Sequence, residues 1–351
     1  MIVPRASVGA DRWDALANES DDAWHWHHHV LQGAMATWTS ATDESFAVAD
    51  PTGAIVAVVP ARRIRYRRAR LLAQARLESV GGPAVAEHLE PRRRQLVMRA
   101  AIDELRAQLK GGDELLVILA PMAPAIRGER CPRVNPLLEA GLENVLSQTW
   151  VVDLRVGEET VWHGLKTRAR RAVRSAEKAG VSVRHAAPDD LDAYVAMHQD
   201  TYRRTGATPH PRAYFAAIWR DLLPTGRAQI FVAEREGAVI GACNYAVDKG
   251  AAFYWTGAST PKGLQLHANY LLHWVAMKWM LDAGLDWCES GEAFPGARAD
   301  KSGGLSYFKA SFGGELYPYY RGRWRRPGAR AVVSDALDLG WTTTSLWSSR
   351  E

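Results

Sequence analysis

The spacing of apolar and polar residues changes several times along the second half of the chain, and each stretch of constant spacing predicts one strand or helix. Two apolar runs joined by the tight turn Arg235-Glu236-Gly237 predict a β-hairpin. A third strand, a long buried helix ending before Gly284 and a fourth strand follow. In chain order these elements are expected at residues 229–234, 238–247, 251–257, 267–281 and 285–289.

The first half of the chain repeats this order of three strands, one helix and one strand. The corresponding elements are expected at residues 45–49, 54–60, 70–77, 91–109 and 114–120. A pattern that recurs once indicates duplication. We therefore expect a first domain over residues 1–156, a second over 157–326 and a C-terminal tail over 327–351, with the boundary at Gly157–Thr160.

The order of elements is the core of the acetyltransferase-like (GNAT) fold. We expect an α/β (α+β) protein with two tandem GNAT-like domains, each a mixed sheet flanked by helices. In that fold two central strands splay apart, and an acyl carrier and an amine meet in the gap between them. The fold class thus predicts an N-acyltransferase with its chemistry in the second half, which is the clearer copy.

A narrower resemblance rests on four segments of the second half. They are Trp162–Gly180 (WHGLKTRARRAVRSAEKAG), Tyr254–Ser259, Asn269–Trp274 and Gly304–Gly314 (GLSYFKASFGG). These segments resemble landmarks of Fem-type aminoacyltransferases, and the resemblance extends over roughly residues 43–324. Fem-type enzymes move an amino acid from aminoacyl-tRNA onto an amine, often of a peptidoglycan precursor. The resemblance therefore implies amide-bond formation with aminoacyl-tRNA as the donor substrate and no separate cofactor.

Composition is typical of a folded protein of the cytoplasm. Of the 351 residues 47% are hydrophobic and 24% charged, and the formal net charge is +5. The three cysteines are far apart in sequence, which favours reduced thiols over disulfides or a zinc site. The start of the chain lacks a signal-peptide core, and prolines interrupt the longest apolar stretch, 114–126. We expect a cytoplasmic protein with no integral membrane segment.

Acylation of an amine passes through a tetrahedral oxyanion, so the enzyme needs a donor or a cation aimed at that oxygen. The resemblance assigns this role to Lys309, which follows Phe308 in the segment FKASFG. It also implies that the ring of Phe308 offers a surface on which the terminal nucleotide or the substrate stacks. The alternative is a core Phe beside a surface Lys. If Lys309 reaches substrate, its ammonium is expected in a solvent-filled cleft.

Further candidates lie where the splayed strands would expose side chains. Glu289, at the end of the last strand, is a candidate base or amine-binding group, and the alternative is a solvated loop carboxylate. Only one of Tyr254 and Trp255 can line the gap, because neighbouring strand residues point to opposite faces. The remaining substrate-binding candidates are Ser259, Asn269, Ser290 and His210.

The segment after the third strand bears on the donor. GNAT enzymes that use CoA carry a glycine-spaced loop there, whose backbone N–H groups hold the pyrophosphate. Residues 260–269 (TPKGLQLHAN) contain the single glycine Gly263. The corresponding region of the first half, 81–94, does not match that loop either. This favours a tRNA-borne donor over acetyl-CoA or another acyl-CoA, which stays the alternative.

A helix expected over residues 161–179 has one basic and one apolar face. At 100° per residue the basic arc contains Lys166, Arg170, Arg171, Arg174 and Lys178. We interpret this arc as a surface for tRNA phosphates, and the alternative is an ordinary solvated face.

No metal site is expected. The run Trp24-His25-Trp26-His27-His28-His29 has no Cys or acidic partners placed to complete one. Three hypotheses remain: an aminoacyl-tRNA-dependent transferase, an acyl-CoA-dependent N-acyltransferase, and a non-catalytic protein that binds tRNA or a precursor. The acceptor, a small-molecule or peptide amine, is not identified by the sequence.

Overall fold

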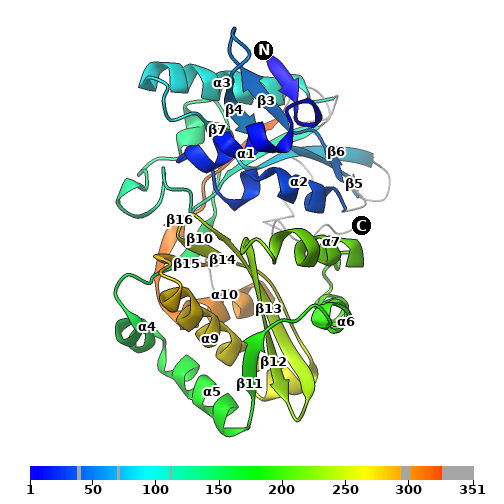
Figure 1. Cartoon of the computed structure of the whole chain (residues 1–351), viewed down its shortest axis with the longest axis vertical. Helices are drawn as coiled ribbons and strands as arrows, with labels where there is room; N and C mark the ends of the chain where they lie inside the picture. The colour runs from blue at the N-terminus through cyan, green and yellow to red at the C-terminus, as the bar shows by residue number, and fades with distance from the viewer. Residues whose placement is uncertain (38–40, 69–71, 111–112, 294–300, 326–351) are drawn as a thin grey trace. The chain divides into compact units, whose positions relative to one another are not determined.

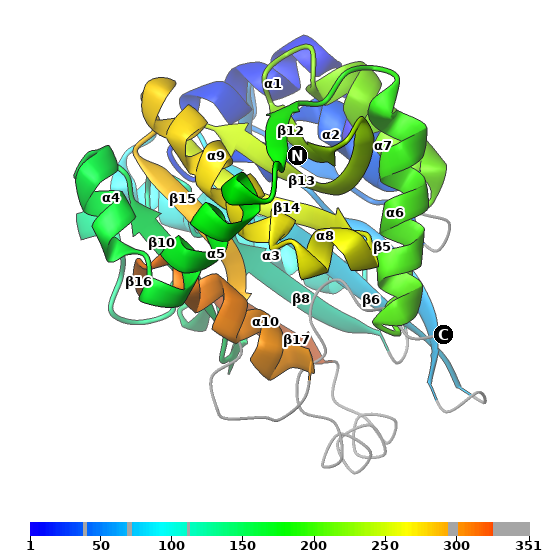
Figure 2. The ribbon, with the colours of Figure 1, turned by 90° about the horizontal axis from the view of Figure 1, so that it is seen from below.

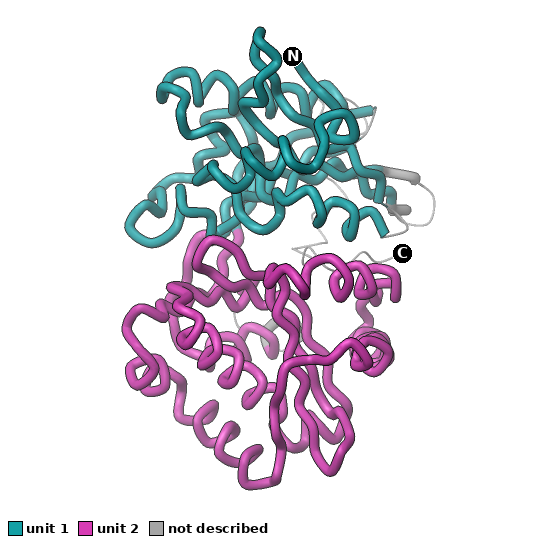
Figure 3. The backbone as a smooth tube through the Cα atoms, viewed as in Figure 1, with its two compact units in different colours: residues 1–146, 319–351 teal, residues 147–318 magenta. Residues whose placement is uncertain are grey.

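The computed structural model describes residues 1–37, 41–68, 72–110, 113–293 and 301–325. The chain forms two compact units, which Figure 3 shows in different colours. Unit 1 contains residues 1–146 and the segment from 319 onward, and unit 2 contains residues 147–318. The expected tail, 327–351, lies outside the described residues.

Unit 1 has two sheets and three α-helices among its described residues. One sheet has the order β1-β3-β4-β7 and the other the order β2-β5-β6-β8-β17-β9. The strands of the first sheet are β1 (Ile2–Pro4), β3 (Phe46–Ala49), β4 (Ile55–Val59) and β7 (Ala84–Val85). Those of the second are β2 (Ala41–Asp43), β5 (Arg62–Arg68), β6 (Leu72–Gly81), β8 (Glu114–Leu119), β17 (Arg321–Arg325) and β9 (Glu143–Val145). The helices are α1 (Ala10–Glu19), α2 (His29–Ala36) and α3 (Pro91–Ala107).

Strand β5 was not expected from the sequence, where its arginines form part of a basic cluster. Arg62 donates to Glu78 at 2.9 Å, and Arg63 is bound by Glu44 and Asp113. Both guanidinium groups are buried, and burial of a charge requires such a partner. These two arginines therefore hold the sheet together through carboxylates that are distant in sequence.

Unit 2 is built on one seven-stranded sheet with the order β11-β12-β13-β14-β15-β10-β16. Its strands are β10 (Gln148–Asp153), β11 (Ser182–His185), β12 (Ala228–Arg235), β13 (Ala238–Asp248), β14 (Ala251–Ser259), β15 (Trp287–Ala293) and β16 (Glu315–Pro318). Its helices are α4 (Glu158–Gly164), α5 (Thr167–Lys178), α6 (Asp190–Arg204), α7 (Arg212–Ala217), α8 (Pro261–Gln265), α9 (Ala268–Asp282) and α10 (Lys301–Lys309).

Helices cover both faces of this sheet. Figure 1 shows α5 and α9 on one side of it and α6 and α7 on the other. Helix α9 is apolar on nearly all sides, as expected of a helix buried between a sheet and another helix. On the opposite face Tyr194 of α6 bonds Thr256 of β14 at 2.6 Å. Unit 2 therefore has the mixed sheet flanked by helices that the sequence predicts, whereas unit 1 has a second, antiparallel sheet beside its mixed one.

The central parallel pair of each unit differs in length. In unit 2, β14 and β15 are paired only from Ala251↔Trp287 to Phe253↔Glu289. Beyond that point β15 continues beside β10. In unit 1, β6 and β8 remain paired from Arg76↔Glu114 to Gly81↔Leu119. Only unit 2 therefore has, among the described residues, the splayed central strands that the fold class predicts for its active site.

The division into units differs from the sequence-based boundaries at both ends. Strand β10, placed by sequence in the first domain, pairs with β15 and β16 of unit 2. Strand β17, placed by sequence in the second domain, pairs with β8 and β9 of unit 1. A return strand of this kind cannot be recognised from local patterns, because its partners precede it by more than 170 residues.

The helix expected over residues 161–179 is two helices. Lys166 has an extended backbone (φ −61°, ψ 148°), and its N–H donates to the carbonyl of Ser311 at 2.9 Å. That tertiary bond ends α4 and starts α5. Among the described residues, no helix is both long and apolar enough to cross a membrane.

Candidate functional site

Lys309 lies where β14 and β15 separate. It ends α10, which packs on β15, and its ammonium donates to the carbonyl oxygen of Glu292 at 2.9 Å. Gly291 stands beside it with a φ of 82°, and a Cβ there would lie 3.0 Å from Lys309 Nζ and 3.6 Å from the Tyr254 carbonyl oxygen. A glycine at this position thus leaves space for the ammonium between the two strands.

The ammonium of Lys309 is buried, so the expectation of a solvent-filled position is wrong for this structure. Lys309 as a whole is 7% exposed to solvent. Burial lowers the pKa of Lys309 to about 8, although the charges of Glu292 and Glu289 oppose this change. A pKa above 7 keeps Lys309 a cation at neutral pH, and the same burial strengthens its field on any neighbouring oxygen. The packing of α10 against β15, which removes the water, cannot be read from sequence.

Two carboxylates share this region with Lys309. Glu289 is 1% exposed and accepts a hydrogen bond from Thr149 of β10 at 2.9 Å. Glu292 is also buried and accepts from Ser147 at 3.0 Å. Neither is a solvated loop carboxylate, because both lie within β15. Ser290, between them in the chain, is buried as well.

Phe308 belongs to an aromatic cluster with residues of α9. Its ring centroid lies 5.0 Å from Tyr270, 5.2 Å from His273 and 5.1 Å from Phe312. The ring is half-buried, so part of it stays open for stacking. His273 was missed by the sequence analysis, although a polar residue within an apolar helix is a signal that it must find a partner.

Tyr254 and Trp255 point to opposite faces of the sheet, as strand geometry predicts. Tyr254 lies against His273 of α9 with 4.3 Å between ring centroids. Trp255 lies against Tyr214 of α7, with 5.9 Å between their ring centroids. Tyr254 is therefore the one that shares the side of Phe308 and α9.

The segment after β14 folds into a short helix in place of an open loop. Thr260 caps α8 by accepting from the N–H of Gly263 at 3.0 Å. A Cβ on Gly263 would lie 2.0 Å from the carbonyl oxygen of Ile240, so α8 rests directly on β13. Ser259 and Asn269 bond to each other and join the end of β14 to the start of α9. These two candidates for substrate binding are thus bonded to each other at the N-terminus of α9.

Comparisons with known proteins place this geometry in a known class. Residues 164–302 match the family model described as acetyltransferase (GNAT) domain. Residues 164–302 thus form a GNAT-type domain, and unit 2, which contains them, is named the GNAT domain. The match spans the splayed strands, α9 and the gap next to Lys309. No curated protein matches the chain.

Solved structures share the fold over nearly the whole chain. FemX is 12% identical with a TM-score of 0.68, covering 94% of this chain and 98% of its own. The C-terminal domain of a putative lysylphosphatidylglycerol synthetase from Agrobacterium fabrum is 14% identical, with a TM-score of 0.58 and coverages of 95% and 96%. A tandem GNAT protein from the clavulanic acid biosynthesis pathway is 14% identical, with a TM-score of 0.51 and coverages of 92% and 97%.

His210 lies on the far face of the GNAT domain from Lys309, against α6. It is fully buried and stacks on Tyr214 at 4.6 Å. Its backbone N–H donates to His198 Nε2 at 3.1 Å. Burial lowers the pKa of His198 to about 3, so this histidine accepts as a neutral ring. His210 therefore anchors the start of α7, and the structure does not bring it to the splayed strands.

The basic residues of α5 in the GNAT domain fall into two groups. Arg170 donates to the carbonyls of His163 at 2.6 Å and Leu165 at 2.8 Å, so it caps the C-terminus of α4. Lys166, Arg171 and Lys178 are exposed. The structure thus assigns Arg170 a structural role and leaves the exposed cations available to a partner.

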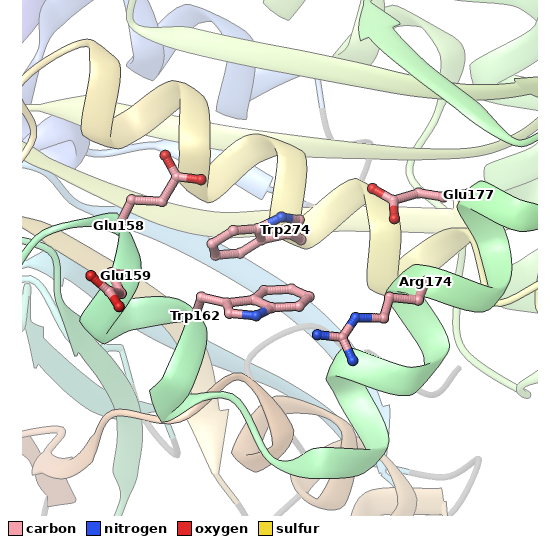
Figure 4. Close-up of a pocket in the computed structure, with 6 residues that line it drawn as sticks. All are labelled: Glu158, Glu159, Trp162, Arg174, Glu177 and Trp274. Carbon is pink, nitrogen blue, oxygen red and sulfur yellow. The ribbon is translucent and has the colours of Figure 1, made fainter.

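Arg174 lines a shallow hollow of about 510 Å³ between α4, α5 and α9 (Figure 4). The rings of Trp162 and Trp274 are in contact there, with 4.7 Å between their centroids and 50° between their planes, and the Arg174 guanidinium lies 5.5 Å from the centroid of the Trp162 ring. The other residues of the hollow are Glu158, Glu159 and Glu177. Glu177 lies three residues after Arg174 on α5 and lines the same hollow, so its negative charge weakens the attraction of Arg174 for phosphate.

The histidine run of unit 1 is part of its packing. His25, His27 and His28 are buried, and His27 contacts the carbonyl of Gly82 through Nε2 at 2.9 Å. Among the described residues no group of three or more His, Cys, Asp or Glu is arranged to hold a metal.

Proposed function

We propose that the GNAT domain transfers an aminoacyl group from aminoacyl-tRNA to an amine and forms an amide bond. The observation that carries the proposal is the buried ammonium of Lys309 at the separation of β14 and β15, where it donates to the Glu292 carbonyl beside Gly291. This is the gap in which the fold brings acyl carrier and amine together. Lys309 also lies in the segment that resembles the Fem-type enzymes.

The reaction needs little from the protein besides charge stabilisation and proton removal. The neutral amine attacks the ester carbonyl carbon, a C–N bond forms, and the carbonyl oxygen becomes an oxyanion. The C–O bond to the ribose then breaks, the ribose oxygen takes up a proton, and the amine nitrogen loses one. In this scheme Lys309 donates an N–H to the oxyanion, where a preorganised cation in a dry site is most effective.

Glu289 is the group that we assign to the amine. It is a buried carboxylate whose position is fixed by Thr149, and it lies close enough to Lys309 to affect that residue's pKa. An ammonium that binds beside Glu289 must lose a proton before the neutral amine can attack, and a carboxylate can accept that proton. Glu292, held by Ser147, adds negative charge on the same strand.

The donor assignment rests on two features of the GNAT domain. Helix α8 occupies the position at which CoA-dependent members hold a pyrophosphate, and its Gly263 is in close contact with β13. Exposed cations on α5 offer a surface for a polyanion, with Lys166, Arg171 and Lys178 as the contacts. Both features favour a tRNA-borne acyl group.

An acyl-CoA donor is the second candidate, and it is supported by the family model. That model describes an acetyltransferase domain. The structure of the tandem GNAT protein from the clavulanic acid pathway is specified as being without AcCoA, which suggests AcCoA as a ligand of that protein. The discriminating feature is α8, which would have to open for its backbone N–H groups to reach a pyrophosphate.

The test compares donors on the purified full-length chain. Transfer is measured from a mixture of labelled aminoacyl-tRNAs, and from labelled acetyl-CoA, to a panel of primary amines that includes amino acids and peptidoglycan precursor peptides. Binding of uncharged tRNA is measured in parallel. We expect transfer from aminoacyl-tRNA, and loss of it in Lys309→Met. Transfer from acetyl-CoA with none from aminoacyl-tRNA would replace this proposal with the second candidate.

A further inference from the structure

His273 is a buried histidine of the GNAT domain for which the proposed reaction has so far no use. It lies on α9 and is 2% exposed. Its Nδ1 is 2.6 Å from the hydroxyl of Tyr245, on β13. Its Nε2 is shielded from solvent and has no hydrogen-bond partner within the described part of the chain.

The contact with Tyr245 fixes which nitrogen carries the proton. Within the described residues the Tyr245 hydroxyl has this histidine as its hydrogen-bond partner and is fully buried. A buried phenol donates its proton, because leaving a donor unpaired costs about 1–3 kcal/mol. Nδ1 is then the acceptor, and the proton of the neutral ring is on Nε2. Burial and the charge of Lys309 lower the pKa of His273 to about 3, so the ring remains neutral at working pH.

The ring is close to the groups of the candidate site. Its centroid lies 4.3 Å from Tyr254 of β14 and 5.2 Å from Phe308, the residue before Lys309. Phe312 covers it at 4.6 Å. The imidazole therefore packs against β14 through Tyr254 and against α10 through Phe308, and the charge of Lys309 is near enough to lower its pKa.

We propose that His273 donates its Nε2–H to the carbonyl oxygen of the acyl group, as a second oxyanion donor beside Lys309. The inference rests on acyl transfer in the splayed strands and is independent of whether the donor is aminoacyl-tRNA or acyl-CoA. His273 neither gains nor loses a proton: its Nε2–H bond persists while the C–N bond forms and the bond from the acyl carbon to its carrier breaks, a C–O bond for aminoacyl-tRNA and a C–S bond for acyl-CoA. A neutral imidazole next to a cation suits this role, because a second positive charge would repel Lys309.

Four enzymes test the role in steady-state kinetics: wild type, Tyr245→Phe, His273→Gln and the double variant Tyr245→Phe/His273→Phe. The double variant removes both polar partners together, so no buried group is left unpaired. We expect it to lose roughly 10²-fold in kcat relative to wild type with little change in KM, as for removal of one oxyanion donor. His273→Gln keeps an amide N–H near the Nε2 position, so we expect it to retain at least about tenfold more activity than the double variant.

A measurement without activity tests the tautomer. In a ¹⁵N–¹H spectrum of histidine side chains, the proton of His273 should be on Nε2 in wild type, and this preference should be lost in Tyr245→Phe. A proton on Nδ1 in wild type would overturn the proposal. So would a water molecule that stays on Nε2 when a substrate analogue is bound.

The kinetic outcome separates this inference from the function on which it rests. If wild type transfers no acyl group from any donor, the proposed function fails. If wild type is active and the double variant keeps kcat within about threefold of Tyr245→Phe, His273 only fills space, and the inference fails alone.

Discussion

Replacement of Lys309 by Met should make the protein more stable while it destroys activity. Burial lowers the pKa of Lys309 from its ordinary 10.5 to about 8. Each pKa unit corresponds to ~1.4 kcal/mol, so holding the charge in this site costs the fold about 3 kcal/mol at neutral pH. Met is similar in length and carries no charge. Loss of the hydrogen bond to the Glu292 carbonyl removes about 1 kcal/mol, which leaves a net gain of about 2 kcal/mol.

The pH dependence of this gain identifies its cause. The unfolded chain keeps the Lys309 proton up to about 10.5, and the folded chain releases it near pH 8. Between these values the unfolded state binds more protons, so the stability of wild type rises with pH. The advantage of Lys309→Met is therefore complete below pH 8, shrinks as pH rises, and should become a deficit of about 1 kcal/mol near pH 10.5, where only the lost hydrogen bond remains.

The assay is chemical denaturation of both proteins at pH 7, 8, 9 and 10, with kcat measured at pH 7. We expect kcat to fall at least about 10²-fold, since the variant lacks the cation at the oxyanion. Lys262→Met is the matched control, because that lysine is exposed on α8 and should show neither effect. A Met variant that is less stable than wild type at pH 7, by an amount independent of pH, would refute the burial argument.

Three further predictions concern the same domain. The kcat of wild type should fall as pH rises through about 8, where Lys309 loses its proton, and Lys309→Arg should lack that alkaline limb in a pH–rate profile because Arg keeps its charge. Glu289→Gln should lower kcat by roughly 10²- to 10⁴-fold if this carboxylate removes the amine proton, whereas an unchanged kcat in kinetic assays would exclude it. Arg171→Ala with Lys178→Ala should reduce the salt slope of tRNA binding by about 2 in a filter-binding titration, whereas Arg170→Ala should lower the melting temperature and leave that slope unchanged.

The repeated element order could be predicted from sequence because hairpins and amphipathic helices are local patterns. Strands β12–β14 and helix α9 lie within two residues of their expected bounds. Strand β5 was missed because its arginines suggest a solvated run, and their partners Glu78 and Asp113 are 16 and 50 residues away. A pattern read along the chain contains no information about such pairs.

The same limit applies to the site. Lys309 was found through a short motif, but its buried position depends on α10 resting on β15, which no local pattern encodes. Arg170 was grouped with the exposed cations because helical periodicity places it on the basic arc. The break at Lys166 brings the end of α4 next to it, and its guanidinium binds carbonyls there. Ion pairs, caps and burial thus decide which of several equivalent charges remain available for function.

The two units differ at the pair of strands where we propose that acyl transfer takes place. In unit 1 the parallel pair β6 and β8 is fully bonded, and Arg76 and Arg325 pair with Glu114 at the point where that pairing begins. Backbone groups that bond each other leave no gap for an acyl group. In unit 2 the bonds stop at Phe253 and Glu289, and Gly291 of β15 lies there beside the ammonium of Lys309, the last residue of α10. A charge that is buried there at a cost to stability is what we expect if Lys309 has the proposed role in catalysis.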